Sequence, residues 1–242
     1  MSKNVIITGG SQGIGKDIVY TLAREGFNII FTYNKSESEA KKIKEELLSE
    51  NLNIEIYKVD VSKKDEIDRF VQFSINKMKK IDVLINNVGI SQIKLFTEIS
   101  EEDWKEMISI NLSSVFFITQ GFVKNMISNQ EGCIINISSI WGNVGASCEV
   151  HYSTAKSGIN GFTKALAKEL GLSNIRVNAI APGIIDTKMN HHLTSEEIKE
   201  IKEEIPLGRI GKEKDISRCI KWLIEDEYTT GQIISINGGW GI

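Results

Sequence analysis

Short apolar runs alternate with longer amphipathic segments along the whole chain. The first apolar run, residues 5–7, ends in Thr8-Gly9, and a helical pattern follows over residues 14–25, where Gly26 stops it. The same alternation continues to the end of the chain. It predicts further strands at residues 27–32, 54–59, 82–85, 133–137, 175–180 and 232–236, and further helices at residues 36–50, 63–79, 101–128, 152–172, 195–204 and 213–224.

This order of elements predicts an α/β fold. A crossover between parallel strands needs a helix, so strands that alternate with helices indicate a parallel sheet with helices on both faces. The chain has 242 residues, two prolines and no linker rich in proline or glycine, which predicts one domain over residues 1–242. We therefore expect a doubly wound parallel sheet of about seven strands.

The charge balance argues against two functional classes, proteins that bind nucleic acid and proteins that bind an anionic membrane. With 29 basic and 32 acidic residues, the chain has no excess of positive charge to hold nucleic acid or an anionic membrane. Every uncharged run is shorter than the roughly 20 residues of a membrane span, and no signal segment precedes the first strand. We expect a cytoplasmic protein whose partners are small molecules or protein-bound groups.

The cysteines and histidines predict no metal site. Cys133, Cys148 and Cys219 are far apart and form no C-x-x-C pair, a pattern typical of reduced, buried thiols. The three histidines, two of them at His191 and His192, form no H-x-x-x-H pair. We expect neither a disulfide nor a bound metal.

A glycine-rich loop follows the first predicted strand. Residues 8–15 have the spacing G-x-x-x-G-x-G, in which glycines allow a tight turn and let a helix N-terminus approach a pyrophosphate. A plain glycine-rich turn is the alternative, but the position at the start of a βαβ unit favours a dinucleotide site of the Rossmann type. The predicted contacts are Thr8, Gly9, Ser11, Gln12, Gly13, Ile14 and Gly15.

The end of the second predicted strand bears on which dinucleotide binds. An NAD site usually has a carboxylate there, about 20 residues past the glycines, to bind the ribose 2′-hydroxyl. This chain has Asn34, Lys35 and Ser36 instead, which favours NADP(H). The alternative is that Lys35 is an ordinary surface lysine.

A tyrosine and a lysine four residues apart carry the candidate chemistry. Tyr152 and Lys156 lie on one face of a predicted helix, about one turn apart. A neighbouring cation stabilises a phenolate, so this spacing predicts that Lys156 lowers the pKa of Tyr152. Ser139 supplies a hydroxyl that can hold a carbonyl oxygen beside the phenol. The Y-x-x-x-K spacing alone is weak, because it also occurs by chance on solvated helices.

Several spaced motifs together give the chain a family resemblance. From Thr8 to the C-terminus it resembles the short-chain dehydrogenases/reductases. The motifs are the glycine loop, Asp60-Val61, Asn86-Asn87-Val88-Gly89, Asn111, Ser139, Tyr152 with Lys156, the stretch from Asn178 to Gly183 with Thr187, and Asn237-Gly238-Gly239.

The resemblance implies a role for each candidate catalytic residue. Tyr152 is expected to protonate the carbonyl oxygen during reduction, and Ser139 to orient and polarise that carbonyl. Lys156 is expected to lower the pKa of Tyr152 and to bind the nicotinamide ribose. Asn111 is expected to kink its helix and hold a water that links Lys156 to solvent; a packing amide is the alternative.

The resemblance also implies further cofactor contacts and one departure. Gln12 stands where many NADP-dependent members have arginine, which weakens the NADP(H) assignment, although Lys16 can replace that charge. The expected contacts are Asp60 and Val61 at the adenine, Asn86 and Gly89 near the adenosine ribose, and Pro182, Gly183, Ile185 and Thr187 around the carboxamide.

The substrate is implied less directly. In length and in its C-terminal motifs the chain is most similar to bacterial 3-oxoacyl-[acyl-carrier-protein] reductases, which reduce a ketone on a thioester-tethered acyl chain. Two arginines expected to dock the acidic carrier protein are replaced by Gln130 and Ser173. Residues 138–150 are also similar to a subgroup that includes the 5-aminopentanone reductase of elongation factor P. There Glu149 can pair with a substrate amine or simply complement the helix dipole, and Trp141 can form a pocket wall.

Two other functions stay open. One is a dehydrogenase of small alcohols, sugars or steroids, and the other is a non-catalytic scaffold, against which the intact candidate residues argue. By resemblance we expect a homotetramer, with the helices at residues 101–128 and 152–172 between subunits. The charged segment at residues 185–206 is predicted to be a lid over the substrate.

Overall fold

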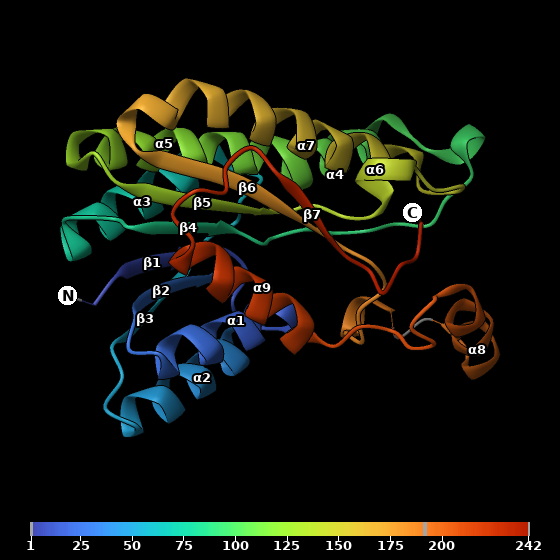
Figure 1. The fold of residues 1–242 in the computed structure, drawn as a ribbon, viewed down its shortest axis with the longest axis horizontal. Coiled ribbons are helices and arrows are strands. Elements are labelled where there is room, and N and C mark those ends of the chain that lie inside the picture. Colours follow the sequence, from blue (N-terminus) through green and yellow to red (C-terminus); the bar gives the residue numbers. More distant parts are fainter. Residues whose placement is uncertain (1, 191–192, 242) are drawn as a thin grey trace.

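The apolar segments pair into one parallel sheet. The computed structural model describes residues 2–190 and 193–241, and within them seven strands follow the order β3-β2-β1-β4-β5-β6-β7 (Figure 1). His191 and His192 lie outside the described residues. The strands are β1 (Asn4–Ile7), β2 (Asn28–Tyr33), β3 (Ile54–Lys58), β4 (Val83–Asn86), β5 (Gly132–Ile137), β6 (Ile175–Pro182) and β7 (Ile233–Ile236).

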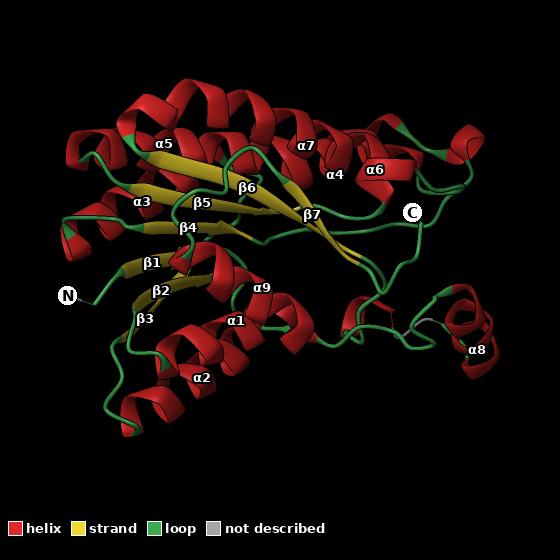
Figure 2. Ribbon diagram, viewed as in Figure 1, coloured by secondary structure: helices red, strands yellow, loops and turns green. Residues whose placement is uncertain are grey.

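Helices connect the strands and cover both faces of the sheet (Figure 2). The α-helices are α1 (Gly13–Arg24), α2 (Glu37–Ser49), α3 (Lys64–Met78), α4 (Glu101–Ile108), α5 (Ser114–Asn129), α6 (Trp141–Val144), α7 (Val150–Leu170), α8 (Ser195–Glu204) and α9 (Glu213–Glu225). A π-helical turn, η2 (Ser109–Ser113), joins α4 to α5, and the 3-10 turns are η1 (Phe96–Glu98), η3 (Gly171–Ser173) and η4 (Lys188–Asn190).

Two hydrophobic cores lie on the two faces of the sheet. Val5 and Ile7 point into the core formed with α1, α2 and α9, whereas Ile6 points into the core formed with α3, α5 and α7. All three side chains are fully buried. Burial on both faces explains why the central strands are continuous apolar runs rather than alternating ones. The predicted fold class, a doubly wound sheet with helices on both faces, is confirmed.

The strand order fixes where a ligand can bind. β1 pairs with β2 on one side and with β4 on the other, all in parallel. The chain therefore builds the sheet outward from β1 to one edge through β2 and β3, and then to the other edge from β4 onward. Such a switch point opens a crevice outside the carboxyl ends of the strands. The loops after β1 and β4 meet there, and the Thr8 N–H donates to the Ile85 carbonyl at 3.0 Å.

Two predicted helices differ from the structure. The predicted helix at residues 101–128 is divided by the π-turn Ser109–Ser113, because the extra residue of that turn cannot be read from a 3.6-residue pattern. The predicted helix from residue 152 begins at Val150, and α6 precedes it. Four residues are too few for α6 to show a periodicity.

One stretch resembles a membrane span by length and composition. Within the described part of the chain, this test selects the helical stretch Glu101–Asn129 alone, and the core helix of a soluble protein passes the same test. Here Ile118, Phe122 and Met126 of α5 are buried against the sheet core. The stretch therefore has the buried face that a core helix needs.

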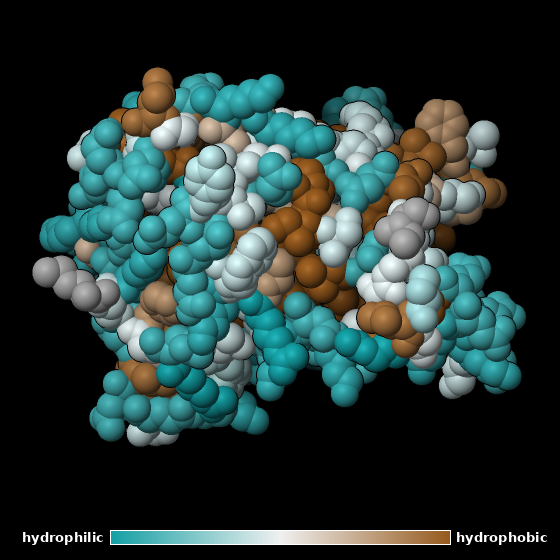
Figure 3. All heavy atoms as spheres, viewed as in Figure 1, coloured by the Kyte–Doolittle hydropathy of each residue, from teal (hydrophilic) through white to brown (hydrophobic). Residues whose placement is uncertain are grey.

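The surface is uneven in polarity. Figure 3 shows hydrophilic side chains over most of the face drawn, with apolar side chains gathered near its centre, over β7. β7 is an edge strand, and its Ile233, Ile234 and Ile236 are half-buried. Helix α8 lies apart from both helical layers (Figure 1), and none of its residues is buried.

Candidate active site

The turn after β5 holds Ser139 against the end of β6. The Ile140 N–H donates to the Pro182 carbonyl at 2.9 Å, and the Trp141 N–H donates to Ser139 Oγ at 3.2 Å. Ser138 points inward, where its hydroxyl donates to Asn160 Oδ1 at 2.7 Å. Neighbouring serines therefore have different surroundings, and Ser139 is the one beside Tyr152.

Tyr152 and Lys156 project from the first turns of α7. Tyr152 is 8% exposed and Lys156 is 4% exposed. Lys156 Nζ donates to the Ile137 carbonyl at 2.9 Å and lies 5.6 Å from the centre of the Tyr152 ring. Ser139 is close enough to the Tyr152 phenol to lower its pKa. The structure thus brings the serine, tyrosine and lysine predicted from the sequence into one buried group.

Burial dominates the titration of this group. Burial raises the pKa of Tyr152 to about 12. The Ser139 side chain acts in the opposite direction and lowers this pKa, whereas the Glu149 carboxylate raises it further. Burial also lowers the pKa of Lys156 to about 8. The spacing predicts that Lys156 lowers the pKa of Tyr152, but burial of the phenol is the largest influence and keeps this pKa above its ordinary value. The Lys156 ammonium is bonded to the Ile137 carbonyl.

Asn111 reaches the same group from the π-turn. Its Oδ1 accepts from the Ile90 N–H at 3.1 Å, and its Nδ2 donates to the carbonyls of Ile90 and Met107 at 3.0 and 3.2 Å. A Cβ added at Gly89 would lie 2.8 Å from Asn111 Oδ1 and 3.4 Å from Lys156 Nζ. Because Gly89 has no side chain, the Asn111 amide from the π-turn and the Lys156 ammonium from α7 can both lie beside it.

The glycine loop forms a cradle at the start of α1. Gly9 and Gly13 have φ values of +70° and +49°, and a Cβ at Gly15 would lie 2.0 Å from the Gly9 carbonyl oxygen. Within the described residues, no side chain caps the N-terminus of α1, so its first N–H groups remain available. Backbone donors at a glycine turn and a helix N-terminus are the groups that bind a pyrophosphate, so the loop fits a dinucleotide.

Two neighbouring loops complete this cradle. Thr8 Oγ1 accepts from the N–H groups of Asn87 and Val88 at 2.9 and 3.2 Å, which ties the glycine loop to the loop after β4. The methyl group of Thr187 lies 3.4 Å from the position that a Cβ would take at Gly13. Ser11 and Ile14 lie in the loop and at its junction with α1, and Ser11 is buried. The segment after β6 thus lies beside the glycine loop.

The predicted 2′-phosphate region lies beside the same loop. β2 ends at Tyr33, and Asn34 and Lys35 are exposed. The Gln12 amide donates a hydrogen bond to the Ser36 hydroxyl. The structure therefore places Gln12, Lys35 and Ser36 at one end of the cradle.

Two predicted adenosine contacts have their polar side chains engaged within the protein. Asp60 Oδ1 accepts from the Ser62 hydroxyl and N–H at 2.7 and 3.1 Å, and these bonds lower the pKa of Asp60. Asn86 Nδ2 donates to Thr119 Oγ1 at 3.0 Å and to Asn136 Oδ1 at 2.9 Å. Val61 is buried next to Asp60. Asn86 thus faces the interior between β4 and β5, whereas Gly89, at the end of its motif, is half-buried.

The segment after β6 is held by β7 and by the turn before α9. The Gly183 N–H donates to the Ile236 carbonyl at 3.0 Å, directly after Pro182 ends the strand. Ile185 is buried and forms an isolated parallel bridge with Gly211. These contacts fix the predicted carboxamide loop on the body of the protein.

A polar network beside Tyr152 escapes the sequence patterns. His151 is fully buried, and its Nε2 lies 3.0 Å from Gln92 Oε1. Gln92 Nε2 donates to Asp103 Oδ1 at 3.0 Å, and Lys94 pairs with the other oxygen of that carboxylate at 2.5 Å. Burial lowers the pKa of His151. The only sequence signal is a histidine next to the tyrosine, which no spacing rule connects to residue 92.

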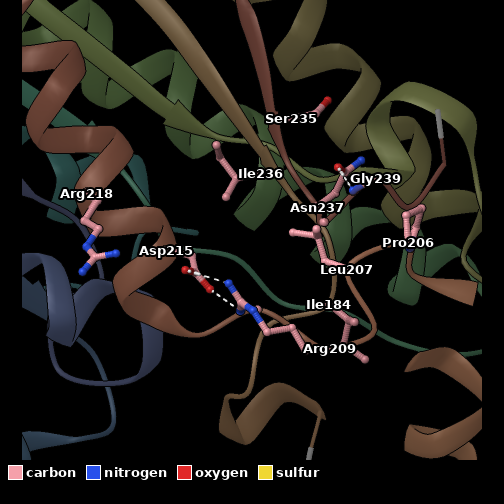
Figure 4. Close-up of a pocket in the computed structure, with 12 residues that line it drawn as sticks. Ile184, Pro206, Leu207, Arg209, Asp215, Arg218, Ser235, Ile236, Asn237 and Gly239 are labelled. Atoms are coloured by element: carbon pink, nitrogen blue, oxygen red, sulfur yellow. Dashed lines mark hydrogen bonds and ion pairs between the residues drawn. The ribbon is translucent and has the colours of Figure 1, made fainter. Parts of the chain in front are cut away.

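A cavity of about 540 Å³ lies at the end of β7 (Figure 4). It is lined by Pro206 and Leu207 after α8, by Asn237 and Gly239 after β7, and by the Arg209–Asp215 ion pair, whose nitrogen and oxygen are 2.7 Å apart. Across the described ranges, no three His, Cys, Asp or Glu side chains group as a metal site requires.

This fold and site define a short-chain dehydrogenase/reductase. The family model described as short chain dehydrogenase matches residues 3–198, and the chain belongs to that family. It is therefore an oxidoreductase that uses a nicotinamide cofactor.

Similar proteins extend over the whole chain. "Uncharacterized oxidoreductase YmfI" of Bacillus subtilis is 41% identical over 243 residues, which cover 99% of both chains. "3-oxoacyl-[acyl-carrier-protein] reductase FabG" of Chlamydia trachomatis is 41% identical over 99% of this chain and 97% of its own. A solved structure of a Serratia marcescens short-chain dehydrogenase/reductase mutant has a TM-score of 0.93 at 30% identity, covering 99% of this chain and 98% of its own.

Proposed function

We propose that the protein is an NADP(H)-dependent reductase that converts a ketone to a secondary alcohol in one catalytic domain. The observation that carries this proposal is the buried group of Ser139, Tyr152, Lys156 and Asn111 around Gly89. A phenol whose pKa is raised to about 12 is protonated at neutral pH, so Tyr152 is ready to give a proton.

Each residue of the group has a distinct task. Ser139 donates a hydrogen bond to the carbonyl oxygen and polarises it, while Tyr152 transfers its proton to that oxygen. Lys156 and Asn111 lie at Gly89, on the route by which the phenolate regains a proton. A reduced nicotinamide supplies, when bound, the hydride for the carbonyl carbon.

The residues at the end of β2 support NADP(H) over NAD(H). No carboxylate stands at residues 34–36, and Lys35 and Ser36 lie where a 2′-phosphate needs positive charge and a hydroxyl. Steady-state kinetics with both reduced cofactors test this assignment. We expect a lower KM for NADPH, and a lower KM for NADH would overturn it.

The leading substrate is a 3-oxoacyl group on acyl carrier protein, as in fatty acid synthesis. The full-length similarity to proteins named FabG supports it. Gln130 and Ser173, which replace the expected docking arginines, lie near one another, because the Asn174 amide donates to the Gln130 carbonyl at 3.2 Å. Because neither position holds an arginine, docking of the carrier protein would depend on other basic residues such as Lys124, Arg176 or Arg209.

A ketone that carries a positively charged amine is the second candidate. Besides burial, which raises the pKa of Tyr152 most, the Glu149 carboxylate is close enough to raise it further. The rings of Trp141 and Trp240 lie 5.0 Å apart beyond Ser139. Carboxylates and aromatic faces attract an ammonium group, which is the chemistry of 5-aminopentanone reduction on elongation factor P.

One substrate panel separates these functions. NADPH oxidation is followed with acetoacetyl-CoA, 3-oxoacyl carrier protein, amine-modified elongation factor P and free ketones. Fastest turnover of the thioesters supports the leading proposal, and fastest turnover of the modified factor supports the second. Turnover of free ketones alone indicates a small-molecule dehydrogenase, and no turnover of any ketone overturns the catalytic proposal.

Exposed apolar side chains support a homotetramer. Phe116 of α5 and Val150 of α7 are 44% and 38% exposed, and β7 leaves an apolar edge. Surfaces of this kind are typical of subunit contacts. Light scattering tests the proposal, with an expected mass four times that of the 27.1 kDa chain.

A further inference from the structure

The segment at residues 237–241, here called the C-terminal segment, lies between two parts of the candidate site. On one side, its Gly238 carbonyl accepts from the Leu207 N–H at 3.1 Å, just after α8. On the other side, a Cβ at Gly241 would lie 2.7 Å from the Ile140 side chain, next to Ser139. Figure 4 shows Asn237 and Gly239 beside Pro206 and Leu207, all four on the lining of the cavity.

Trp240 joins these two sides through its ring. Its indole packs edge-to-face on Trp141, with ring centres 5.0 Å apart and planes 66° apart. The backbone N–H of Trp141 donates to Ser139 Oγ at 3.2 Å. Trp240 thus packs directly on the residue whose backbone N–H donates to the Ser139 hydroxyl.

The polar edge of the same ring holds the lid helix. Trp240 Nε1 donates to Glu204 Oε2 at 3.1 Å, and Glu204 is the last residue of α8. No residue of α8 is buried, so packing gives this helix little hold on the body. The hydrogen bond from Trp240 therefore fixes the C-terminal end of α8 on the side that faces Trp141.

We propose that Trp240 and Glu204 are positioning residues that set the place of α8 over the ketone-binding region, and that the pair Trp141 and Trp240 forms its specificity-determining wall. The proposal rests on the proposed function, because it concerns the ketone that Tyr152 protonates. It predicts that the clasp between Trp240 and Glu204 affects ketone binding and leaves proton transfer and dinucleotide binding unchanged.

Kinetics of matched variants test the clasp. Trp240→Phe keeps an aromatic ring against Trp141 but removes the N–H donor, and Glu204→Leu removes the acceptor. Each is expected to raise the ketone KM about three- to tenfold, the effect of one solvent-exposed hydrogen bond, with kcat and the Kd for NADPH changed less than about twofold. Glu204→Gln keeps an acceptor oxygen and is expected to restore most of the loss.

The double variant and the controls make the test specific. Because both changes remove one bond, Trp240→Phe with Glu204→Leu is expected to have the KM of a single variant. The controls are Glu203→Gln, a neighbouring exposed acid on α8, and Trp222→Phe, an exposed indole on α9, and both are expected to match the wild type. Additive losses, or equal losses in NADPH affinity, would overturn the proposal.

A second measurement does not depend on activity. Hydrogen exchange of the α8 amides, residues 195–204, is expected to be faster in Trp240→Phe than in the wild type and the controls. If every ketone fails but α8 exchange rises, the catalytic proposal is wrong while the clasp stands. If α8 exchange and ketone KM are both unchanged, the clasp is wrong.

Discussion

At the scale of single residues, one cause acts in opposite directions on the two titrating groups. Burial disfavours whichever form carries charge, so it raises the pKa of Tyr152 and lowers that of Lys156. The phenol is thereby kept as a proton donor, and the lysine titrates near the working pH. The Y-x-x-x-K spacing identifies these residues, but it carries no information about the depth at which they lie.

Removing the phenol oxygen tests the proposed acid. Tyr152→Phe keeps the ring in its buried site and is expected to lower kcat for ketone reduction by about 100-fold or more, the usual contribution of general acid catalysis. The Kd for NADPH, measured by fluorescence, is expected to change little. Tyr228→Phe, at a side chain 97% exposed, is the control. Unchanged kcat in Tyr152→Phe would contradict the assignment.

Lys156 predicts a rise of stability with pH. Its pKa is about 8 in the folded protein against 10.5 for a free lysine, so between these values the unfolded chain binds more protons. The free energy of unfolding therefore rises from pH 8 to 10.5, by up to about 3 kcal/mol from this group. Tyr152, with its pKa raised, acts in the opposite sense above pH 10. Urea unfolding of the wild type and of Lys156→Met at pH 8 and at pH 10.5 measures their free energies of unfolding. A difference between the two proteins that does not change with pH would contradict this account.

At the scale of elements, the site depends on junctions that sequence periodicity does not resolve. The π-turn places Asn111 toward Ile90, and α6 follows directly on the Ser139 turn. Both are short departures from regular geometry. The family motif finds Asn111, whereas no pattern in the sequence shows that its helix is wound differently there.

Gly89→Ala tests the meeting of two of these elements. The added methyl group would stand 2.8 Å from Asn111 Oδ1 and 3.4 Å from Lys156 Nζ, so one of them must move. We expect kcat to fall at least tenfold and the unfolding free energy to fall by about 1–3 kcal/mol, as for overpacking. Gly161→Ala in α7 is the matched control, because its added Cβ meets no atom within 4 Å. It is expected to retain activity and to be slightly more stable.

At the scale of the whole molecule, the sheet could be predicted and its surroundings only in part. Continuous apolar runs such as Val5 to Ile7 identify central strands because both faces of them are buried. The contacts of the C-terminal segment and the link from His151 to Gln92 join residues far apart in the chain. No local pattern encodes such a contact, so these parts of the site needed the structure.

A charge on the apolar helical face tests the proposed assembly. Phe116 of α5 packs against Phe162 of α7, with ring centres 6.2 Å apart, yet it is 44% exposed. If this face joins subunits, Phe116→Glu buries an unpaired carboxylate and the mass in light scattering falls below four chains. Leu172→Glu, at a fully exposed leucine, is expected to leave the mass unchanged. A wild-type mass of one chain would contradict the tetramer.

The amides buried between β5 and α7 have a further consequence for how the chain folds. Asn136 donates to Thr163 Oγ1 at 2.9 Å, and the Ser138 hydroxyl donates to Asn160 Oδ1 at 2.7 Å. A slip of α7 by one residue rotates its side chains by about 100° and leaves these polar groups buried without partners. Misaligned packing is thus penalised before any ligand arrives. The same hydrogen-bonded pairs that destabilise a misaligned α7 also place Tyr152 beside Ser139. The position of the phenol is therefore set when the chain folds.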